Sequence, residues 1–382
     1  MALLNILAAA ALVVWVYLIV ARGGFWLAAE RDEGAPAPPA WPAVVAVIPA
    51  RDEADSVGQT IASLLRQDYP GEFSVVLVDD QSSDGTADVA RQAAAASADR
   101  LIIVKGADLP AGWTGKLWAM KQGVERALTS EPGYLLFTDA DIVYGPGTLI
   151  CLVSRSQAED LVLNSLMVKL RCENFAERAF IPAFIFFFQM LYPFAWVNDR
   201  ARATAAAAGG CMLVRHEALV AAGGIEAIRG ALIDDCALAR GLKPQGPIRL
   251  SLTERAHSIR GYPAMLDIRR MVARSAYTQL GYSPALLAGA IAGMALVYLV
   301  PPLLALFANG TAQTLGLIAW TLMAVAFLPI LRFYRLSPFW APSLPLIALG
   351  YMAFTVDSAY QYARKRGGQW KGRVQSNVTG VQ

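Results

Sequence analysis

An uncharged stretch at the start of the chain constrains its fold most strongly. Residues 1–21 carry no charged side chain, and their apolar run ends at Arg22, which is about the length needed to cross a bilayer. A cleaved signal peptide is the competing interpretation, but the basic segment that normally opens one is missing, and no small-residue cleavage site precedes Arg22. We therefore predict an N-terminal transmembrane anchor in residues 1–29.

A second apolar region lies near the other end. Residues 275–331 are uncharged and long enough for two spans separated near Asn309, and residues 336–356 form a third uncharged stretch. Three prolines crowd that last stretch, so a re-entrant or interfacial segment is an alternative to a third span. We predict a membrane region of two or three spans in residues 275–360, followed by a basic tail in residues 361–382.

The composition of the 382-residue chain excludes several classes of protein. Hydrophobic residues make up 56% and charged residues 16%, whereas soluble globular chains average about 25% charged residues. The net charge is only +3, from 33 basic and 30 acidic residues, which argues against binding nucleic acid. The four cysteines form no C-x-x-C pair and indicate neither a zinc site nor a disulfide framework: Cys151, Cys172, Cys211 and Cys236.

Basic residues flank the predicted spans and indicate the orientation of the chain. Arg22 and Arg31 follow the first span, and a group of arginines precedes the second: Arg269, Arg270 and Arg274. Positive charge favours the cytoplasmic side, so we expect residues 43–274 to form a cytoplasmic domain after a proline-rich linker in residues 30–42. Three C-terminal spans would place the basic tail outside, and the sequence leaves this conflict open.

One apolar segment interrupts the central domain. Residues 179–197 are uncharged and long enough to span, but a span there would separate the flanking motifs across the membrane. We interpret the segment as an interfacial, lipid-lining element, with a buried core helix as the alternative.

The central domain alternates short apolar runs with helical patterns. Strands are expected at residues 44–49, 73–80, 101–105 and 134–142, and helices at residues 61–65, 86–96 and 115–128. This alternation predicts an α/β fold with a doubly wound, mostly parallel sheet, in which ligands bind beyond the carboxyl ends of the strands.

Acidic side chains follow three of these strands. Asp80 comes directly after a buried strand, where its carboxylate can accept a hydrogen bond from a nucleobase. Asp139 and Asp141 are two residues apart, so in an extended segment both point the same way. Two such carboxylates can address a hard divalent cation and its bound diphosphate. An aspartate at a strand end can also merely cap the next helix. After this strand, residues 82–85 already supply the cap, which leaves Asp80 available to a nucleobase.

The order of several motifs resembles that of a known family. VVAVIPARDE, VVLVDDQSSDGT, GKLWAMKQG, FTDADI, the Gly209-Gly210-Cys211 turn and IDDCALARGL follow one another as in membrane-bound family-2 glycosyltransferases. The whole chain looks most like the hopene-associated glycosyltransferases of hopanoid-producing bacteria. The resemblance implies a GT-A type nucleotide-diphosphosugar-transferase fold, a bacterial inner membrane location and inverting transfer of a sugar, probably from a UDP-linked donor, with Mg²⁺ or Mn²⁺ as cofactor.

The resemblance also implies roles for individual residues of this sequence. Pro49, Ala50 and Glu53 would line the nucleoside, Asp80 would contact the base, Lys116 would meet uracil or phosphate, Asp139 and Asp141 would hold the metal, and Asp235 would be the general base beside Asp234. Two positions depart from the pattern. Asp52 stands where asparagine is usual, and the Q/R-x-x-R-W signature is reduced to a segment ending in Arg274. Arg270 and Arg274, one helical turn apart, would clamp the leaving diphosphate, or would only anchor the chain at the membrane.

These features predict an enzyme whose acceptor is reached from the bilayer. A hopanoid lipid is the favoured acceptor, with polyprenyl phosphate and sphingoid lipids as alternatives. A processive polysaccharide synthase is disfavoured, because four spans at most make a poor export channel. A catalytically silent nucleotide-sugar binding subunit is the alternative from another class. His216 and His257 are the only histidines, and His216 is expected to be a surface residue.

Overall fold

The computed structural model describes residues 1–364, 369–370 and 373–374. The basic tail predicted for residues 361–382 therefore lies mostly outside the described residues. The chain divides into two compact units. A helical unit contains the described residues of Met1–Ala29, Cys172–Ala195 and Tyr262–Gly368, and a sheet unit contains Glu30–Arg171, Trp196–Gly261 and the described residues of Gln369–Gln382.

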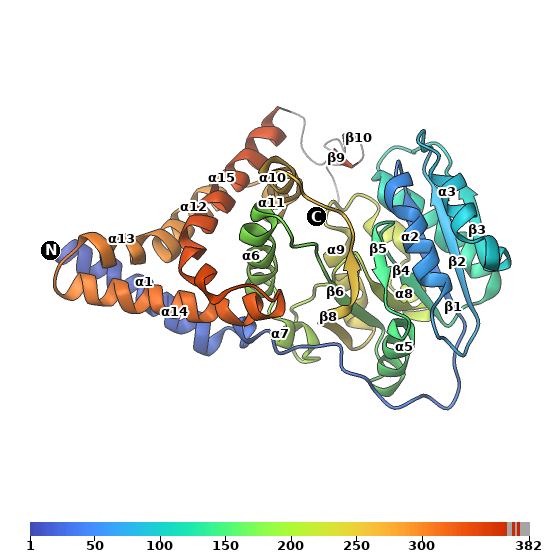
Figure 1. Ribbon diagram of the computed structural model, residues 1–382, viewed down its shortest axis with the longest axis horizontal. Helices are drawn as coiled ribbons and strands as arrows, with labels where there is room; N and C mark the ends of the chain where they lie inside the picture. Colours follow the sequence, from blue (N-terminus) through green and yellow to red (C-terminus); the bar gives the residue numbers. More distant parts are fainter. Residues whose placement is uncertain (365–368, 371–372, 375–382) are drawn as a thin grey trace. The chain divides into compact units, whose positions relative to one another are not determined.

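An eight-stranded mixed sheet forms the centre of the sheet unit (Figure 1). Its strands, in the spatial order β3-β2-β1-β4-β7-β6-β8-β5, are β1 (Val44–Ala50), β2 (Phe73–Asp79), β3 (Leu101–Lys105), β4 (Tyr134–Phe137), β5 (Ile142–Tyr144), β6 (Leu163–Lys169), β7 (Met212–Arg215) and β8 (Ile248–Ser258). The first four strands of that order are parallel to one another, and so are β6 and β8. The pairs β4–β7, β6–β7 and β5–β8 are antiparallel. A separate pair of two-residue strands, β9 (Gln369–Trp370) and β10 (Arg373–Val374), is antiparallel.

The α/β class and the parallel strands predicted at the N-terminal side of the domain are confirmed. One prediction was wrong in detail: the expected strand at residues 134–142 is two strands, β4 and β5, separated by Thr138–Asp141. β5 leaves β4 and pairs with β8, so the acidic residues lie in a connecting loop and not within a strand. The helix expected at residues 86–96 ends at Ala93 and is followed by a 3₁₀ helix, Ala95–Arg100.

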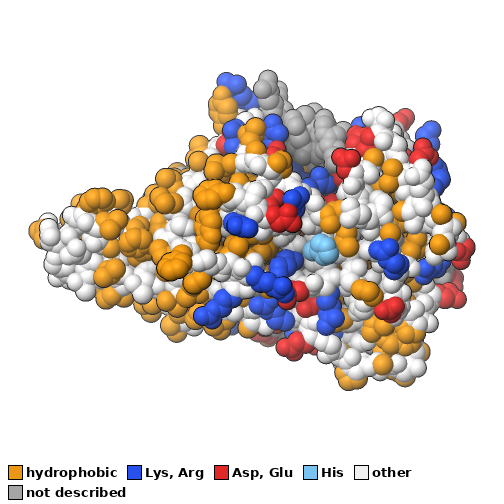
Figure 2. Space-filling model, viewed as in Figure 1, with side chains coloured by type: hydrophobic (Ala, Val, Ile, Leu, Met, Phe, Trp, Pro, Cys, Tyr) orange, Lys and Arg blue, Asp and Glu red, His pale blue; other side chains and the backbone are white. Residues whose placement is uncertain are grey.

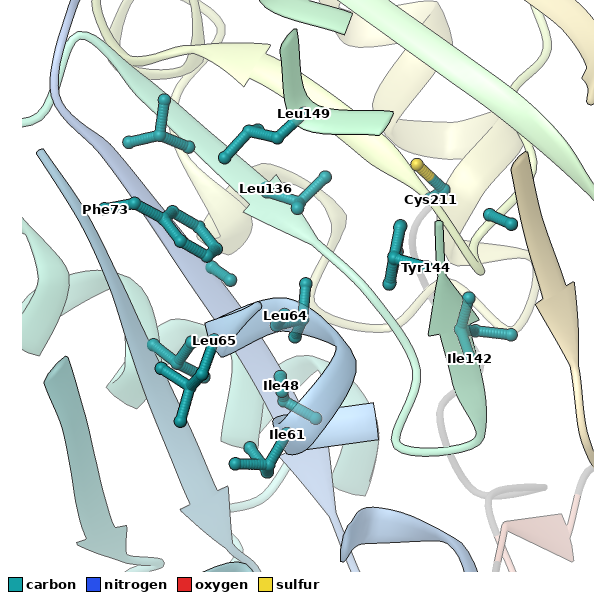
Figure 3. Close-up of a cluster of buried hydrophobic side chains, with 14 of the residues drawn as sticks. Ile48, Ile61, Leu64, Leu65, Phe73, Leu136, Ile142, Tyr144, Leu149 and Cys211 are labelled. Carbon is teal, nitrogen blue, oxygen red and sulfur yellow. The ribbon is translucent and has the colours of Figure 1, made fainter. Parts of the chain in front are cut away.

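Helices cover both faces of the parallel strands, which explains their unbroken apolar sequences. Ile48 and Leu77 face a core with Ile61 and Leu64 of α2, together with Phe73 and Leu136 (Figure 3). The alternate residues face α4, where a Cβ added to Gly123 would lie 2.4 Å from Val47 Cγ1 and 3.0 Å from Val78 Cγ2. The absence of a side chain at Gly123 thus lets α4 lie close against the sheet. The helices of this unit are α2 (Ala54–Leu65), α3 (Thr86–Ala93), α4 (Gly115–Ala127), α5 (Thr148–Ala158), α8 (His216–Ala221) and α9 (Asp234–Leu242), with α7 (Phe194–Asn198) at the boundary of the two units.

Within its described residues, the helical unit contains four helices long and apolar enough to cross a membrane: Ala2–Ala21, Pro284–Phe307, Thr311–Phe333 and Pro338–Ala363. Its helices are α1 (Ala2–Ala21), α6 (Phe175–Leu191), α10 (Met265–Ala273), α11 (Ala276–Gln279), α12 (Pro284–Met294), α13 (Val300–Phe307), α14 (Thr311–Phe333) and α15 (Leu344–Ala363). Figure 2 shows hydrophobic side chains over much of the visible face of α1, α13 and α14. The large exposed apolar residues of α1 and α13 include Leu3, Ile6, Val20, Leu303 and Phe307.

The uncharged segment at residues 179–197 falls mainly in α6. Asn174 caps this helix in a capping box with Glu177, whose side chain is fully buried. The ring of Phe180 packs against Tyr351 and Phe354 of α15, with centroid distances of 5.7 and 5.4 Å. The helix thus packs against other helices of its unit, and its interfacial role stays a prediction.

A hydrogen bond joins α1 to an interrupted helix. A π-helix, Ala295–Leu299, connects α12 and α13, and Pro301 and Pro302 follow it. Neither proline has an N–H, so the carbonyl of Val297 loses the partners that residues i+4 and i+5 normally supply. The indole N–H of Trp15 donates to this carbonyl oxygen at 2.8 Å. A side chain of α1 therefore satisfies a backbone group that the prolines leave open.

Candidate active site

The carboxyl ends of β1, β2 and β4 bring the predicted acidic residues to one edge of the sheet. The three strands are parallel and adjacent, with Ala50 in register with Asp79 and Val47 in register with Phe137. Asp80 follows β2, and Asp139 and Asp141 follow β4. Pro49 and Ala50 are the buried last residues of β1, and the carbonyl of Ala50 accepts from the amide of Asp80 at 2.8 Å.

Lys116 connects two of the predicted site aspartates. It lies in the first turn of α4, and its Nζ is 2.9 Å from Oδ1 of Asp139 and 3.0 Å from Oδ2 of Asp234. Burial alone lowers the pKa of Lys116, but the two carboxylates outweigh it and raise that pKa above its ordinary value. Lys116 is therefore a charged, buried link between the loop after β4 and the start of α9.

Asp235 holds the glycine turn before β7. Its Oδ2 accepts from the amide of Gly209 at 3.0 Å, and its Oδ1 accepts from the amide of Cys236 at 2.7 Å. The N-cap of α9 is Ile233, so Asp235 lies inside the first turn and is not the N-cap. A Cβ added to Gly209 would lie 3.4 Å from Nζ of Lys116 and 3.5 Å from Oδ2 of Asp235, which places the three groups around one point.

Arg260, directly after β8, bridges two carboxylates from different loops. Its Nε donates to Oδ2 of Asp141 at 3.0 Å, and its Nη2 donates to Oε1 and Oε2 of Glu53 at 2.7 and 3.0 Å. The hydroxyl of Ser258 also donates to Oδ2 of Asp141, at 2.9 Å. Burial alone lowers the pKa of Arg260, but the charges of Asp141 and Glu53 outweigh this effect and raise the pKa above its ordinary value. The guanidinium therefore stays in its charged form.

Asp80 and Asp52 have distinct local roles. Asp80 is fully buried, and Nη1 of Arg51 lies 3.7 Å from its carboxylate and donates to its carbonyl oxygen at 2.6 Å. Asp52 has a φ of 48°, and its Oδ1 accepts from the amide of Ser83 at 2.8 Å. An asparagine Oδ1 can accept the same bond, so the departure at this position preserves the loop contact. Asp84 accepts from the amides of Thr86 and Ala54 at 3.0 and 2.9 Å, the first residues of α3 and α2. The N-cap of α3 is Gly85, which has no side chain to cap the helix.

The electrostatic balance favours proton uptake by two of the aspartates. Burial raises the pKa of Asp235 to about 6, the charge of Asp234 adds to the rise, and Lys116 opposes it. The side chain of Asp139 is partly exposed, but the loss of surrounding water raises the pKa of its carboxyl group. Lys116 opposes this rise, and the charge of Asp141 adds to it. A carboxylate with a pKa near 6 is well placed to accept a proton near neutral pH.

The donor set around Asp139 and Asp141 fits a divalent cation that a diphosphate completes. Among the described residues, no group of three or more His, Cys, Asp and Glu side chains is arranged to hold a metal ion. Mg²⁺ is commonly bound by one or two carboxylates together with substrate phosphates and water, and two carboxylates are present here. Both now face cations, Asp139 facing Lys116 and Asp141 facing Arg260, so a metal would have to compete for them.

The structure thus brings together most of the residues singled out from the sequence. Asp139, Lys116, Asp234 and Asp235 form one connected group, and Glu53 and Asp141 are joined through Arg260. Arg270 and Arg274 belong to the helical unit, where Arg270 pairs with Asp267 at 3.4 Å, and their proposed role toward a diphosphate stays a prediction. Arg260 and Ser258 were missed, because the sequence analysis assigned no strand to residues 248–258.

Comparison with known proteins shows which family the sheet unit is similar to. Residues 45–221, just under half of the chain, match the family model for glycosyl transferase family 2. The matched range lies mainly in the sheet unit, which is therefore similar to family 2 glycosyltransferase domains and has a mixed sheet of the GT-A type. The site residues Asp234, Asp235 and Arg260 lie beyond the matched range.

Particular relatives narrow the comparison. The 4,4'-diaponeurosporenoate glycosyltransferase of Staphylococcus aureus (strain MRSA252) is 36% identical over 102 residues, which cover 27% of this chain and 24% of that protein. The enzyme of the same name from strain USA300 is 35% identical over 102 residues, with the same coverage. The chain thus matches about a quarter of the length of these relatives. Among solved structures, a mannosyltransferase from Pyrobaculum calidifontis in complex with GDP-Man and Mn²⁺ is similar, with a TM-score of 0.55, 19% identity, and coverage of 94% of this chain and 98% of that one. That similarity establishes the fold.

Proposed function

We propose that this protein transfers a sugar, with inversion, from a nucleotide sugar to a membrane lipid, with a divalent cation at Asp139 and Asp141. The observation that carries the proposal is the cluster in which Lys116 joins Asp139 to Asp234, next to the carboxylate of Asp235. This cluster combines metal-ligand chemistry and a proton acceptor at the edge of the sheet where α/β folds bind ligands.

Each residue has a distinct task in the proposed reaction. Asp235, with its pKa raised to about 6, accepts the proton of the acceptor hydroxyl as that oxygen attacks the sugar carbon. Lys116 holds Asp139 and Asp234 in place and adds positive charge where the diphosphate departs. A bound Mg²⁺ or Mn²⁺ would supply Lewis-acid stabilisation of that diphosphate. Pro49, Ala50, Glu53 and Asp80 border the nucleoside in this proposal.

The acceptor is proposed to be a lipid for two reasons. In the part of the chain that the structure describes, four helices are long and apolar enough to span a membrane. The curated relatives are named for a glycosyltransferase of diaponeurosporenoate, a lipid-like acceptor. A hopanoid lipid in a bacterial inner membrane is our favoured acceptor, and polyprenyl phosphate, sphingoid and carotenoid lipids are the competing ones. Turnover of the nucleotide sugar would distinguish an enzyme acting on any of these lipids from a catalytically silent binding subunit.

The test uses the full chain purified in detergent with bacterial lipid extract. We expect release of nucleoside diphosphate and a new glycolipid by mass spectrometry when the cognate nucleotide sugar and Mn²⁺ are present, and loss of both with EDTA. Asp141→Asn keeps the shape but removes a charge, so turnover should fall by about 10²-fold or more. Asp108→Asn, which changes an exposed aspartate outside the cluster, is the control. Near-normal turnover by a folded Asp141→Asn protein would exclude the metal assignment.

The orientation is tested independently. The positive flanks place the catalytic domain in the cytoplasm in this proposal, so a cysteine introduced at Gly34 in the linker should resist a membrane-impermeant thiol reagent in intact cells. Labelling without permeabilisation would place the domain outside, away from cytosolic nucleotide sugars.

A further inference from the structure

Arg260 occupies a position between the two loops that the proposed reaction must coordinate. Its guanidinium contacts Asp141, the proposed metal ligand, and Glu53, which is proposed to border the nucleoside. These carboxylates are largely buried, with 9% and 12% of their side chains exposed, whereas the Arg260 side chain is 39% exposed. The arginine therefore covers two inner carboxylates from the outer, ligand-accessible side.

We propose that Arg260 is a positioning residue that acts as an exchangeable counter-ion: it neutralises Asp141 without metal and is displaced from Asp141 when the metal binds. This inference rests on the proposed function, because it requires the cation to bind at Asp139 and Asp141. Oδ2 of Asp141 accepts from the Ser258 hydroxyl and from the Nε–H of Arg260, so a metal ion held by this oxygen would have to take the place of the Nε–H. A metal ion at this oxygen and the Nε–H of Arg260 would therefore exclude each other.

The displaced guanidinium keeps its second anchor. Nη2 donates to both oxygens of Glu53, so loss of the Asp141 bond leaves the arginine tethered at the nucleoside loop. Its Nε–H and remaining N–H groups are then available to an anion, and arginine matches phosphate oxygens in two-point geometry. Metal binding thus frees N–H groups of Arg260 to donate hydrogen bonds to the diphosphate. By linkage, the nucleotide strengthens metal binding by the same factor as the metal strengthens nucleotide binding.

A rigid structural role for Arg260 gives different expectations. If Arg260 only tied β8 to the loop after β4, its loss would weaken metal binding by disordering Asp141. If it is a competing counter-ion, its loss should strengthen binding of the metal alone, because one cation no longer has to be displaced. The sign of the change in affinity separates the two roles.

The experiment measures Mn²⁺ binding to the purified full chain by electron paramagnetic resonance, without nucleotide and then with UDP or GDP. For Arg260→Gln we expect the Kd for Mn²⁺ alone to fall about tenfold, which corresponds to one charge-assisted hydrogen bond. The factor by which UDP or GDP tightens Mn²⁺ binding should fall at the same time. Arg255→Gln removes the same charge from β8 at a residue that pairs with Asp32, and it should leave both quantities unchanged.

Arg260→Lys keeps the charge and provides a second variant if Arg260→Gln fails to fold. Its Mn²⁺ affinity should stay within about threefold of wild type, while the nucleotide coupling falls, because an ammonium lacks the planar fork that serves two partners. Unchanged or weaker Mn²⁺ binding by folded Arg260→Gln, or wild-type coupling in Arg260→Lys, would overturn the inference.

Asp141→Asn separates this inference from the proposed function. If wild type binds no Mn²⁺, or if Asp141→Asn binds it as well as wild type does, the metal assignment fails and the counter-ion role fails with it. If Asp141→Asn loses Mn²⁺ binding but Arg260→Gln behaves as wild type, only the role of Arg260 is wrong.

Discussion

The amide of Gly209 donates to Oδ2 of Asp235 at 3.0 Å, across 26 residues of sequence. The bond fixes the carboxylate against the turn before β7, and the first turn of α9 holds its other oxygen. Because backbone amides orient both of its oxygens, the carboxylate of Asp235 is held in one geometry. The position of Asp235 is therefore set by the chain itself, before any substrate arrives.

Asp235→Asn tests the base directly. An asparagine Oδ1 can replace only one of the two carboxylate oxygens that accept from Gly209 and Cys236, so one of these bonds is lost. The fold and nucleotide binding should be kept, but the proposed proton acceptor is lost. We expect transfer to fall on the order of 10²- to 10⁴-fold. Asp234→Asn, which keeps Asp235 intact, should retain more activity. Transfer by Asp235→Asn within a few-fold of wild type would move the base elsewhere, with Asp234 as the next candidate.

The pH dependence of transfer provides a second test of Asp235. Its pKa is raised to about 6, so the rate should rise with pH through about 6 and level off above it. Asp234→Asn removes the neighbouring negative charge and should shift this acidic limb to lower pH. The raised pKa also means that the folded protein binds a proton that the unfolded chain releases between pH 3.8 and about 6. Because the folded protein holds this proton and the unfolded chain does not, the contribution of Asp235 to the free energy of unfolding falls as pH rises through that window. If the acidic limb of the pH–rate profile has the same midpoint in wild type and in Asp234→Asn, the assignment of this limb to Asp235 is wrong.

Gly123→Ala tests the close approach of α4 to the sheet. The new Cβ would lie 2.4 Å from Cγ1 of Val47, a stiff β-branched side chain, so the helix or the strand must shift. Overpacking costs about 1–3 kcal/mol, and the gain in helix propensity offsets about 1 kcal/mol of that cost. We expect a net loss of stability in thermal unfolding. Gly241→Ala in α9 is the matched control, because its Cβ would meet only Ala222 at 4.0 Å, and it should be neutral or slightly stabilising.

Trp15→Phe tests the bond between α1 and the π-helix. Phenylalanine keeps an aromatic ring against Tyr298 but leaves the carbonyl of Val297 without its indole donor. A buried acceptor left open costs about 1–3 kcal/mol, so unfolding in detergent, followed by circular dichroism, should shift to lower temperature. Tyr17→Phe changes a half-exposed residue of the same helix and should have little effect. Equal unfolding temperatures for Trp15→Phe and wild type would show that the bond contributes nothing.

The sequence predicted the parts of this fold that depend on local pattern. β1 and β3 were located to within a residue, because strands buried on both faces have continuous apolar runs. The break between β4 and β5 was missed, since it depends on pairing of β5 with β8, more than 100 residues later in the chain. Arg260 was missed for the same reason. Its partners, Glu53 and Asp141, are 207 and 119 residues away, and no local pattern records such contacts.

The order in which the two units occur along the chain has a consequence for synthesis on the ribosome. All eight strands of the large sheet are complete once Ser258 has been made, whereas α1 and α6 still lack α12, α13, α14 and α15. Domains generally fold as units when their segments have emerged. The eight-stranded sheet can therefore form first, whereas the indole N–H of Trp15 gains its acceptor, the carbonyl of Val297, only 282 residues downstream. The bond that joins α1 to the π-helix therefore forms only after every strand of the large sheet has been made.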